Sequence, residues 1–317
     1  MAHVERPTVA VTGLSGYVGT RLGELFGETL ALVDWYRTSP SNAALASYQL
    51  DLCDEAAVAL ALQRDRPRAV INVAAQANVD VCEQERDDRE GSAWRINATA
   101  PGVLARACCS SGIRFVHVST DYVFDGQDGP YHEQSPTDGA ANWYGNTKLA
   151  GERAVTVAGG DFAIARIMMP YRRPPASRID LPQLIRNRLS QGQTFSAATD
   201  QLVAPTFLDD IIDALATLMF VHGQGIYHLA GATLLSPFEA ALIVARTFQL
   251  DESLVEASTL DAITGQGNRA PRPARSALLS QRFRTEYGTQ LARPLRGFAE
   301  GVGMLRHDVE PRKGTIS

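Results

Sequence analysis

Short apolar runs alternate with segments of helical periodicity through the first half of the chain. The runs Thr8–Thr12, Leu30–Val33, Ala69–Val73 and Phe115–Ser119 predict strands. Between them, apolar positions recur at helical spacing over Gly16–Phe26, about Asp54–Arg64 and about Ala93–Ser111. Strands that alternate with helices indicate an α/β fold, a doubly wound parallel sheet of the Rossmann type.

The pattern is less regular after residue 170, where prolines break the chain into short pieces. Helices are predicted at about Leu181–Gln191, Asp209–Val221 and near 237–248, 276–286 and 294–305, with a strand at Ile226–Leu229. We therefore expect a nucleotide-binding Rossmann domain over 1–170, a smaller, mainly helical C-terminal substrate-binding region over 171–306, and a loose tail over 307–317. A late strand could rejoin the main sheet.

Composition and charge exclude several classes of protein. The 317 residues carry 30 basic and 35 acidic side chains, a formal net charge of -5, so no overall basic field attracts a nucleic acid. No apolar run approaches the roughly 20 residues that span a bilayer, and no signal-peptide pattern opens the chain. The four cysteines fit no metal-ligand spacing. We expect a cytoplasmic protein without a metal, nucleic-acid or membrane partner.

A glycine-rich turn joins the first predicted strand to the first predicted helix. It reads Thr12-Gly-Leu-Ser-Gly-Tyr-Val-Gly19. Gly13 would allow the tight turn, Gly16 the approach of a pyrophosphate to the backbone, and Gly19 close packing of helix on strand. The N–H groups of the helix N-terminus would then face the phosphates. This context predicts a dinucleotide cofactor.

The choice between NAD(H) and NADP(H) stays open at the second strand. Asp34, which the pattern places at the end of that strand, would hold the adenosine ribose and favour NAD. Arg37 comes three residues after Asp34. Together with Thr38 and Ser39, it would instead bind a 2′-phosphate. We give NADP(H) a slight preference.

A Tyr-x-x-x-Lys pair supplies the candidate acid–base chemistry. Tyr144 and Lys148 lie four residues apart, on one face of a helix. A nearby ammonium, helped by the positive charge of a bound cofactor, would lower the phenol pKa from about 10, so that the tyrosine can give a proton to a carbonyl oxygen as hydride reaches the carbon. Thr120, at the end of a predicted strand, would hydrogen-bond and polarise the same oxygen.

Together these motifs resemble the extended short-chain dehydrogenase/reductases, and within them the dTDP-4-dehydrorhamnose reductase branch. The resemblance covers most of the chain. Its most specific stretches are Ser119-Thr-Asp-Tyr-Val-Phe124 and Trp143-Tyr-Gly-Asn-Thr-Lys-Leu-Ala-Gly-Glu152, supported by Val70-Ile-Asn-Val-Ala-Ala-Gln-Ala-Asn-Val-Asp80. Members of this group are often dimers, so the resemblance also implies a homodimer.

The resemblance implies a role for each matching position. The catalytic residues would be Thr120, Tyr144 and Lys148. The cofactor would be lined by Gly13, Ser15, Gly16, Tyr17 and Val18 at the pyrophosphate, by Asp51 and Leu52 at the adenine, and by Ala74, Ala75 and Gln76 at the ribose and nicotinamide. The sugar would lie near Asp80, Asp121 and Tyr122.

Three departures from the branch fall on the substrate side. Met169 stands where the branch has a tryptophan, and Arg275 where it has an asparagine. The segment 138–142, before the catalytic tyrosine, lacks the usual proline. Both Met169 and Arg275 are therefore candidate substrate-binding residues, and the changes indicate retained redox chemistry on a somewhat different sugar nucleotide.

The function that the sequence predicts is reduction of the C4 ketone of a nucleotide-linked 4-keto-6-deoxyhexose by NAD(P)H. One alternative is a non-catalytic, NADP-binding protein similar to the regulatory subunit of methionine adenosyltransferase, because a fold does not guarantee chemistry. Another is an epimerase or dehydratase of the wider family. A dehydratase usually has Asp-Glu after the catalytic threonine, whereas Asp121-Tyr122 follows Thr120 here.

Overall fold

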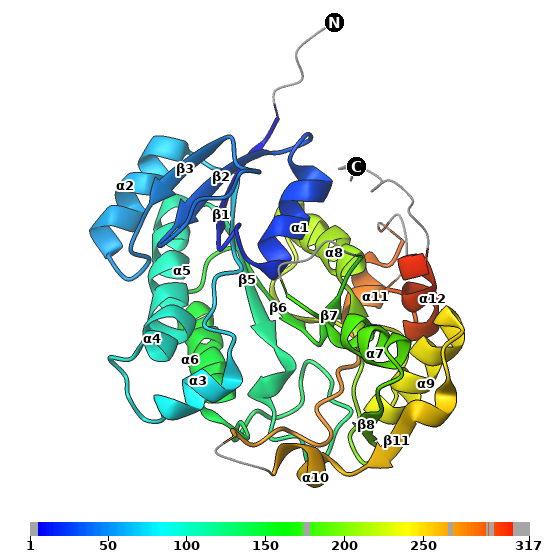
Figure 1. The fold of residues 1–317 in the computed structure, drawn as a ribbon. Coiled ribbons are helices and arrows are strands. Elements are labelled where there is room, and N and C mark those ends of the chain that lie inside the picture. Colours follow the sequence, from blue (N-terminus) through cyan, green and yellow to red (C-terminus); the bar gives the residue numbers. More distant parts are fainter. Residues whose placement is uncertain (1–5, 174–177, 266–268, 290, 292–294, 307–317) are drawn as a thin grey trace, which may run out of the picture.

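A seven-stranded parallel sheet forms the centre of the molecule (Figure 1). The computed structural model describes residues 6–173, 178–265, 269–289, 291 and 295–306. The sheet order is β10-β6-β5-β4-β1-β2-β3. Its strands are β1 (Thr8–Thr12), β2 (Ala31–Tyr36), β3 (Ala46–Gln49), β4 (Ala69–Asn72), β5 (Arg114–Thr120), β6 (Phe162–Ile167) and β10 (Gly225–Leu229). The predicted doubly wound Rossmann sheet is thus confirmed.

Helices cover both faces of the sheet because successive strand side chains point to opposite sides. In β1, Val9 and Val11 pack toward α1 (Tyr17–Phe26) and α8 (Leu208–Phe220), whereas Ala10 packs toward the opposite helices. The helices on that opposite face are α2 (Glu55–Asp65), α5 (Ala100–Ser111) and α6 (Trp143–Ala158).

The C-terminal region adds a second hydrophobic core beside the sheet. Two parallel strand pairs belong to it, β7 (Pro170–Tyr171) with β9 (Thr206–Phe207) and β8 (Phe195–Ala198) with β11 (Val255–Ser258). Its other elements are α7 (Leu181–Ser190), α9 (Pro237–Phe248), η3 (Glu252–Leu254), α10 (Leu260–Thr264), α11 (Gln281–Tyr287), α12 (Phe298–Gly303) and η4 (Met304–Arg306). The region is therefore mainly helical in its described part.

Several elements differ from the predicted ones. The predicted strand at Leu30–Val33 continues to Tyr36, and the helix predicted near 276–286 begins at Gln281. The helix predicted at about Ala93–Ser111 is interrupted: α4 (Ser92–Trp94) passes into a π-helical turn, η1 (Arg95–Thr99), before α5. The pattern missed β3, whose polar residues lie at a half-exposed sheet edge, and β6, whose apolar run contains the buried Arg166.

The late strand β10 pairs in parallel with β6 at the edge of the main sheet. Residues beyond 170 therefore contribute to the sheet, although the division of the chain into two domains stays a prediction. The tail predicted over 307–317 lies outside the described residues. Two further short elements border the site described next, α3 (Val79–Gln84) and the 3₁₀ turn η2 (Asp121–Val123).

Candidate active site

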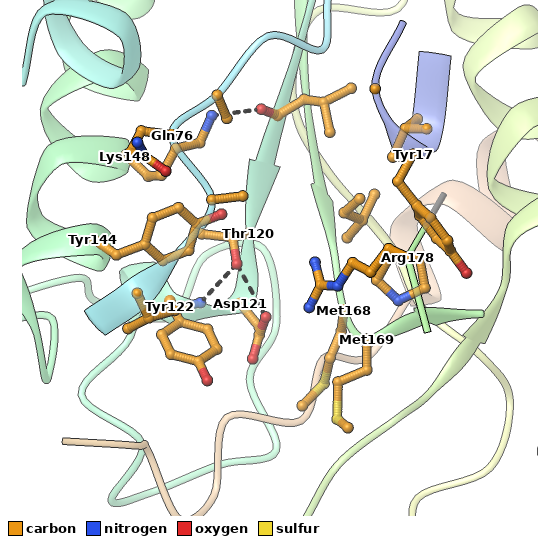
Figure 2. Close-up of a pocket in the computed structure, with 18 of the residues that line it drawn as sticks. Tyr17, Gln76, Thr120, Asp121, Tyr122, Tyr144, Lys148, Met168, Met169 and Arg178 are labelled. Carbon is orange, nitrogen blue, oxygen red and sulfur yellow. Dashed lines mark hydrogen bonds between the residues drawn. The ribbon is translucent and has the colours of Figure 1, made fainter. Parts of the chain in front are cut away.

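A cavity of about 790 Å³ opens at the carboxyl ends of the sheet strands. This is the edge at which parallel α/β sheets bind ligands. One wall consists of the glycine loop, the ends of β2, β4 and β5, and the start of α6. The opposite wall comes from the C-terminal region, including Phe195, Gln201 and Leu260. Figure 2 shows Thr120 and Tyr144 on one side, with Met168 and Met169 across from them.

The glycine loop is shaped to admit a pyrophosphate. Gly13 has a left-handed φ of +72°, and a Cβ there would lie 2.8 Å from the backbone nitrogen of Ala74. The amide of Gly16 donates to the Gly13 carbonyl at 3.0 Å, closing the turn. Gly16 precedes α1, and no side chain caps the helix there. The residues present thus fit a dinucleotide, because a phosphate can accept from a helix N-terminus without a competing side chain.

Asp34 lies inside the second strand and not at its end, and its binding of the adenosine ribose stays a prediction. The side chain is fully buried inside β2, two residues before the strand ends, and is not part of the cavity lining. Its Oδ2 accepts from the Ser41 amide at 2.7 Å, and burial raises the pKa of its carboxyl group. The residues that do line the cavity beyond β2 are Arg37, Thr38 and Ser39.

The start of α6 places Tyr144 and Lys148 against the end of β5. Asn142 caps the helix by accepting from the Gly145 amide at 2.9 Å. Gly145 packs so closely on η2 that a Cβ would lie 2.9 Å from the carbonyl carbon of Tyr122. The rings of Tyr122 and Tyr144 meet edge to face, with centroids 5.6 Å apart. Tyr144 is thereby held beside Thr120 at the cavity wall (Figure 2).

The expected lowering of the tyrosine pKa is not found in the free protein. Burial raises the pKa of Tyr144 well above its ordinary value, and a hydrogen bond with Thr120 only partly opposes this. The Nζ atom of Lys148 donates to the Val118 carbonyl at 2.7 Å. Tyr144 is consequently protonated at neutral pH, the form in which a tyrosine can donate a proton.

Lys148 is almost completely buried in the sheet side of α6. Burial lowers its pKa to about 8, although the carboxylate of Glu152 raises it. Glu152 itself pairs with the buried Arg166 of β6 at 2.7 Å. Lys148 therefore remains mainly charged at neutral pH but lies close to its titration point.

Asp121 ties the catalytic strand end to the C-terminal region. Its two carboxylate oxygens accept from Thr120 at 3.1 Å and from Ser276 at 2.7 Å. Burial raises the pKa of Asp121 to about 6 despite these hydrogen bonds. Ser276 also lines the cavity and, like the π-turn residue Asn97, was not among the predicted residues.

Asn97 fixes the loop that follows β4. Its amide accepts from the Gln76 nitrogen and donates to the Gln76 carbonyl, both at 3.0 Å, and it donates to Thr147 at 3.1 Å. No sequence signal marked this position, because the π-helical turn that directs the side chain inward interrupts an otherwise helical pattern.

Most of the predicted site residues come together at this cavity. The lining includes Gly13, Ser15, Gly16, Tyr17, Val18, Arg37, Leu52, Ala74, Ala75, Gln76, Thr120, Asp121, Tyr122, Tyr144, Lys148 and Met169. Three predicted residues, Asp51, Asp80 and Arg275, are not part of the lining. The binding and catalytic roles of all of these residues stay predictions.

The three residues outside the lining have protein partners of their own. Asp51 pairs with Arg95 at 3.0 Å, and Arg275 donates to the Gly129 carbonyl at 3.1 Å. Asp80 accepts from Arg272 at 3.0 Å. Arg272 does line the cavity, so the arginine that reaches the site is the first of the Arg-Pro-Ala-Arg segment and not Arg275.

The described residues show neither a metal-binding cluster nor a membrane-spanning helix. They contain no group of three or more His, Cys, Asp or Glu side chains that could hold a metal ion. Every helix among them is too short or too polar to cross a membrane.

Comparison with known proteins places the chain in a family. The sheet, the glycine loop and the cavity-lining Tyr-x-x-x-Lys pair define an extended short-chain dehydrogenase/reductase. Residues 7–302 match the family described as RmlD substrate binding domain. The chain belongs to this family, and the resemblance to the dTDP-4-dehydrorhamnose reductase branch is confirmed.

Curated relatives agree with this assignment. A dTDP-4-dehydrorhamnose reductase of Mycolicibacterium smegmatis is 34% identical over 282 residues, 86% of this chain and 78% of that protein. A probable dTDP-4,6-dihydroxy-2-methyloxan-3-one 4-ketoreductase of Streptomyces antibioticus is 33% identical over 300 residues, 92% of each chain. A probable low-salt glycan biosynthesis reductase of Haloferax volcanii is 30% identical and covers 84% of this chain and 88% of its own.

Solved structures share the fold. The dTDP-4-dehydrorhamnose reductase of Bacillus anthracis in complex with NADP superposes with a TM-score of 0.80 at 24% identity, covering 95% of this chain and 99% of that one. A hypothetical dTDP-4-dehydrorhamnose reductase of Sulfolobus tokodaii gives a TM-score of 0.77 at 30% identity, covering 94% and 99%.

Proposed function

We propose that this protein reduces the C4 ketone of a nucleotide-linked 4-keto-6-deoxyhexose with NADPH or NADH. The observation that carries the proposal is one cavity lined by the glycine loop, Thr120, Tyr144 and Lys148. The names of the relatives favour the same substrate class, since two of them are reductases of dTDP-linked keto sugars.

The opposite wall of the cavity suits a substrate that carries a nucleoside diphosphate. Arg272 and Arg178 line it and would attract the phosphate charges. The apolar side chains of Phe195, Leu260 and Ile263 lie on the same wall and would cover a base or sugar. The cavity is therefore lined on one side by residues suited to the cofactor and on the other by residues suited to the sugar nucleotide.

Three side chains would carry out the proton transfer. When NADPH is bound, it supplies hydride to the ketone carbon. Tyr144 gives its phenolic proton to the ketone oxygen, so that the carbonyl becomes an alcohol. The Thr120 hydroxyl, which donates to Asp121 in the free protein, would rotate to donate to the same ketone oxygen. Lys148 stabilises the phenolate that remains, and this lowers the pKa of Tyr144 during the reaction.

NADPH is the cofactor that we propose as preferred. Arg37, Thr38 and Ser39 face the cavity where a 2′-phosphate would lie, whereas the carboxylate of Asp34 is buried and held by Ser41. Arginine binds phosphate through two parallel hydrogen bonds, and the lining segment Arg37, Thr38 and Ser39 carries no acidic side chain that would repel it.

The test is the absorbance of the reduced nicotinamide with dTDP-4-keto-6-deoxyglucose, its 3,5-epimerised form, and either cofactor. We expect oxidation that is faster with NADPH. Tyr144→Phe should lower kcat by about 100-fold or more, because a positioned acid contributes ~10²–10⁴. Cofactor fluorescence should show that the variant still binds NADPH.

Two results would contradict the proposal. If Tyr144→Phe retains more than about a tenth of the wild-type rate, Tyr144 is not the acid, since the expected contribution is at least ~10². If the wild-type protein binds NADPH but oxidises it with neither sugar, the reductase assignment fails. A binding subunit would then be the better interpretation, and a partner should copurify with it.

A further inference from the structure

A row of buried polar side chains runs beneath the active site, from Lys148 into the sheet. It consists of Lys148 on α6, His117 on β5, Asn72 on β4 and Thr12 on β1, and none of the four is more than 2% exposed. Uncompensated polar groups are costly in such a place, so each must be satisfied by its neighbours. The proposed reduction uses Lys148 and leaves the other three unexplained.

The distances make the row continuous. Lys148 Nζ lies 3.4 Å from His117 Nε2, and Asn72 Nδ2 lies 3.0 Å from His117 Nδ1. The Thr12 hydroxyl donates to Asn72 Oδ1 at 2.5 Å. The parallel register aligns these strands, with Thr12 opposite Asn72 and Asn72 opposite His117. Backbone pairing thus fixes the spacing of the row.

The hydrogen atoms of this row can be arranged in two consistent ways. With Lys148 as an ammonium, Nε2 of His117 must accept, so Nδ1 carries the proton and donates to the amide oxygen of Asn72. With Lys148 neutral, Nε2 carries the proton and donates to Nζ, Nδ1 accepts from the Asn72 amide, and the amide oxygen accepts from Thr12. The contacts given above are those of the second arrangement, and a flip of the Asn72 amide produces the first.

We propose that His117 is a positioning residue whose tautomer follows the charge of Lys148, with Asn72 as the side chain that adapts to it. A neutral imidazole that accepts from the ammonium holds Nζ in place and favours its charged form. Burial, and then the Lys148 charge, lower the pKa of His117 well below its ordinary value, so the ring does not compete for the proton. The row ends at the buried Thr12 and therefore orients Lys148 without delivering protons to solvent.

At neutral pH, the charged form of Lys148 should favour the first arrangement, in which Nδ1 of His117 carries the proton. Hydrogen bonds to charged groups are stronger than neutral ones, so the ammonium outweighs the single Thr12–Asn72 bond that the flip gives up. When Lys148 is neutral, the hydrogen bond from Thr12 determines the orientation of the Asn72 amide and so the tautomer of His117. The Thr12 oxygen already accepts from the Ala74 amide at 3.4 Å, and its proton is therefore directed to Asn72 Oδ1.

The other charged groups near the row differ from Lys148 in their partners or in their surroundings. On α6, Glu152 faces Lys148 but is paired with Arg166 of β6. Tyr144, also on α6, has a pKa raised well above its ordinary value, and Asp121 of η2, with a pKa of about 6, contributes to that shift. A change in His117 centred near pH 8 can thus be attributed to Lys148.

The test is the tautomer of His117, measured by long-range ¹H–¹⁵N NMR on the full chain with labelled histidine. We expect Nδ1–H at about pH 6 and Nε2–H at about pH 10, on either side of the Lys148 pKa of about 8. In Lys148→Met, the Nε2–H form should be present at both pH values. The spectrum of His117→Phe identifies the signal.

His228 provides an internal control. It is equally buried, but its Nε2 lies 3.3 Å from Nη1 of Arg166, which stays charged throughout this range. Its tautomer should not change. If His117 has the same tautomer in wild-type protein at about pH 6 and in Lys148→Met, the proposal is overturned. This measurement needs no substrate, so it is independent of whether the protein is a reductase.

A kinetic consequence rests on the proposed function. His117→Phe should move the alkaline limb of the pH–kcat profile to lower pH by about one unit, because one acceptor of the ammonium is lost. His117→Gln, whose amide oxygen can accept at the Nε2 position, should restore most of that shift. A His117→Phe variant that is folded and has an unchanged limb would contradict the positioning role.

Discussion

The two walls of the cavity are built on different principles. The wall at the sheet depends on backbone geometry, because Gly13 comes so close to Ala74 that no side chain fits between them. The wall from the C-terminal region depends on side chains, such as Arg272 held by Asp80. A wall made of backbone can change little without losing its ligand, whereas a wall made of side chains can change one residue at a time. Under the proposed function, this difference would allow the sugar to vary while the redox chemistry is retained.

The left-handed residues of the two walls illustrate the contrast. Gly13 adopts a φ of +72° without cost, since glycine has no Cβ. Met169 adopts a φ of +39°, which costs a residue with a side chain about 1 kcal/mol or more. Glycine would have been the relaxed choice there, so the methionine fits the prediction that its side chain serves in the cavity.

The largest expected effect follows from adding a methyl group to the sheet wall. Gly13→Ala should weaken NADPH binding about 100-fold, because the loop must move away from the Ala74 backbone and a shift of that kind displaces the phosphate site. Titration of cofactor fluorescence measures this change.

Gly112→Ala is the matched control for Gly13→Ala. Gly112 has a similar φ of +63° at the end of α5, but a Cβ there would meet nothing within 4 Å. It should lose about 1 kcal/mol of stability and bind NADPH as the wild type does. Equal NADPH affinities for the two variants would show that the close approach of Gly13 to Ala74 is not what shapes the wall.

A smaller effect is expected from the substrate wall. Arg272→Ala should raise the KM for the sugar nucleotide roughly tenfold, the effect of one charge-assisted hydrogen bond, with kcat and NADPH binding little changed. Arg275→Ala should change KM less than about twofold, because its guanidinium faces the Gly129 carbonyl outside the cavity. The reverse order of the two KM values would restore the role that the sequence suggested for Arg275.

The sheet wall could be predicted from the sequence better than the wall from the C-terminal region. The sheet wall comes from motifs whose residues are close in sequence, so the glycine loop, Thr120 and the Tyr144–Lys148 pair could be identified together. The fold followed from the strand and helix periods, with three exceptions: the polar edge strand β3, the strand β6 with its buried Arg166, and the π-helical turn before α5.

The substrate wall could not be predicted in the same way, because its residues meet only through tertiary contacts. Asp80 and Arg272 lie 192 residues apart, and Asp121 and Ser276 lie 155 apart. Even the direction of a pKa depended on the fold: a neighbouring lysine suggested a lowered pKa for Tyr144, but burial raises it in the free protein.

The smallest expected effect separates function from packing at Met169. Met169→Gly removes a half-buried side chain, a loss of ~1 kcal/mol, and relieves a left-handed strain of ~1 kcal/mol, so the free energy of unfolding should change little. The KM for the sugar nucleotide should nevertheless rise about fivefold, the effect of ~1 kcal/mol of apolar contact, while NADPH binding stays the same. Denaturant unfolding and steady-state kinetics on one preparation measure both quantities. A loss of about 2 kcal/mol or more with an unchanged KM would make Met169 a packing residue like the buried Met168, and its strained backbone would then need another cause.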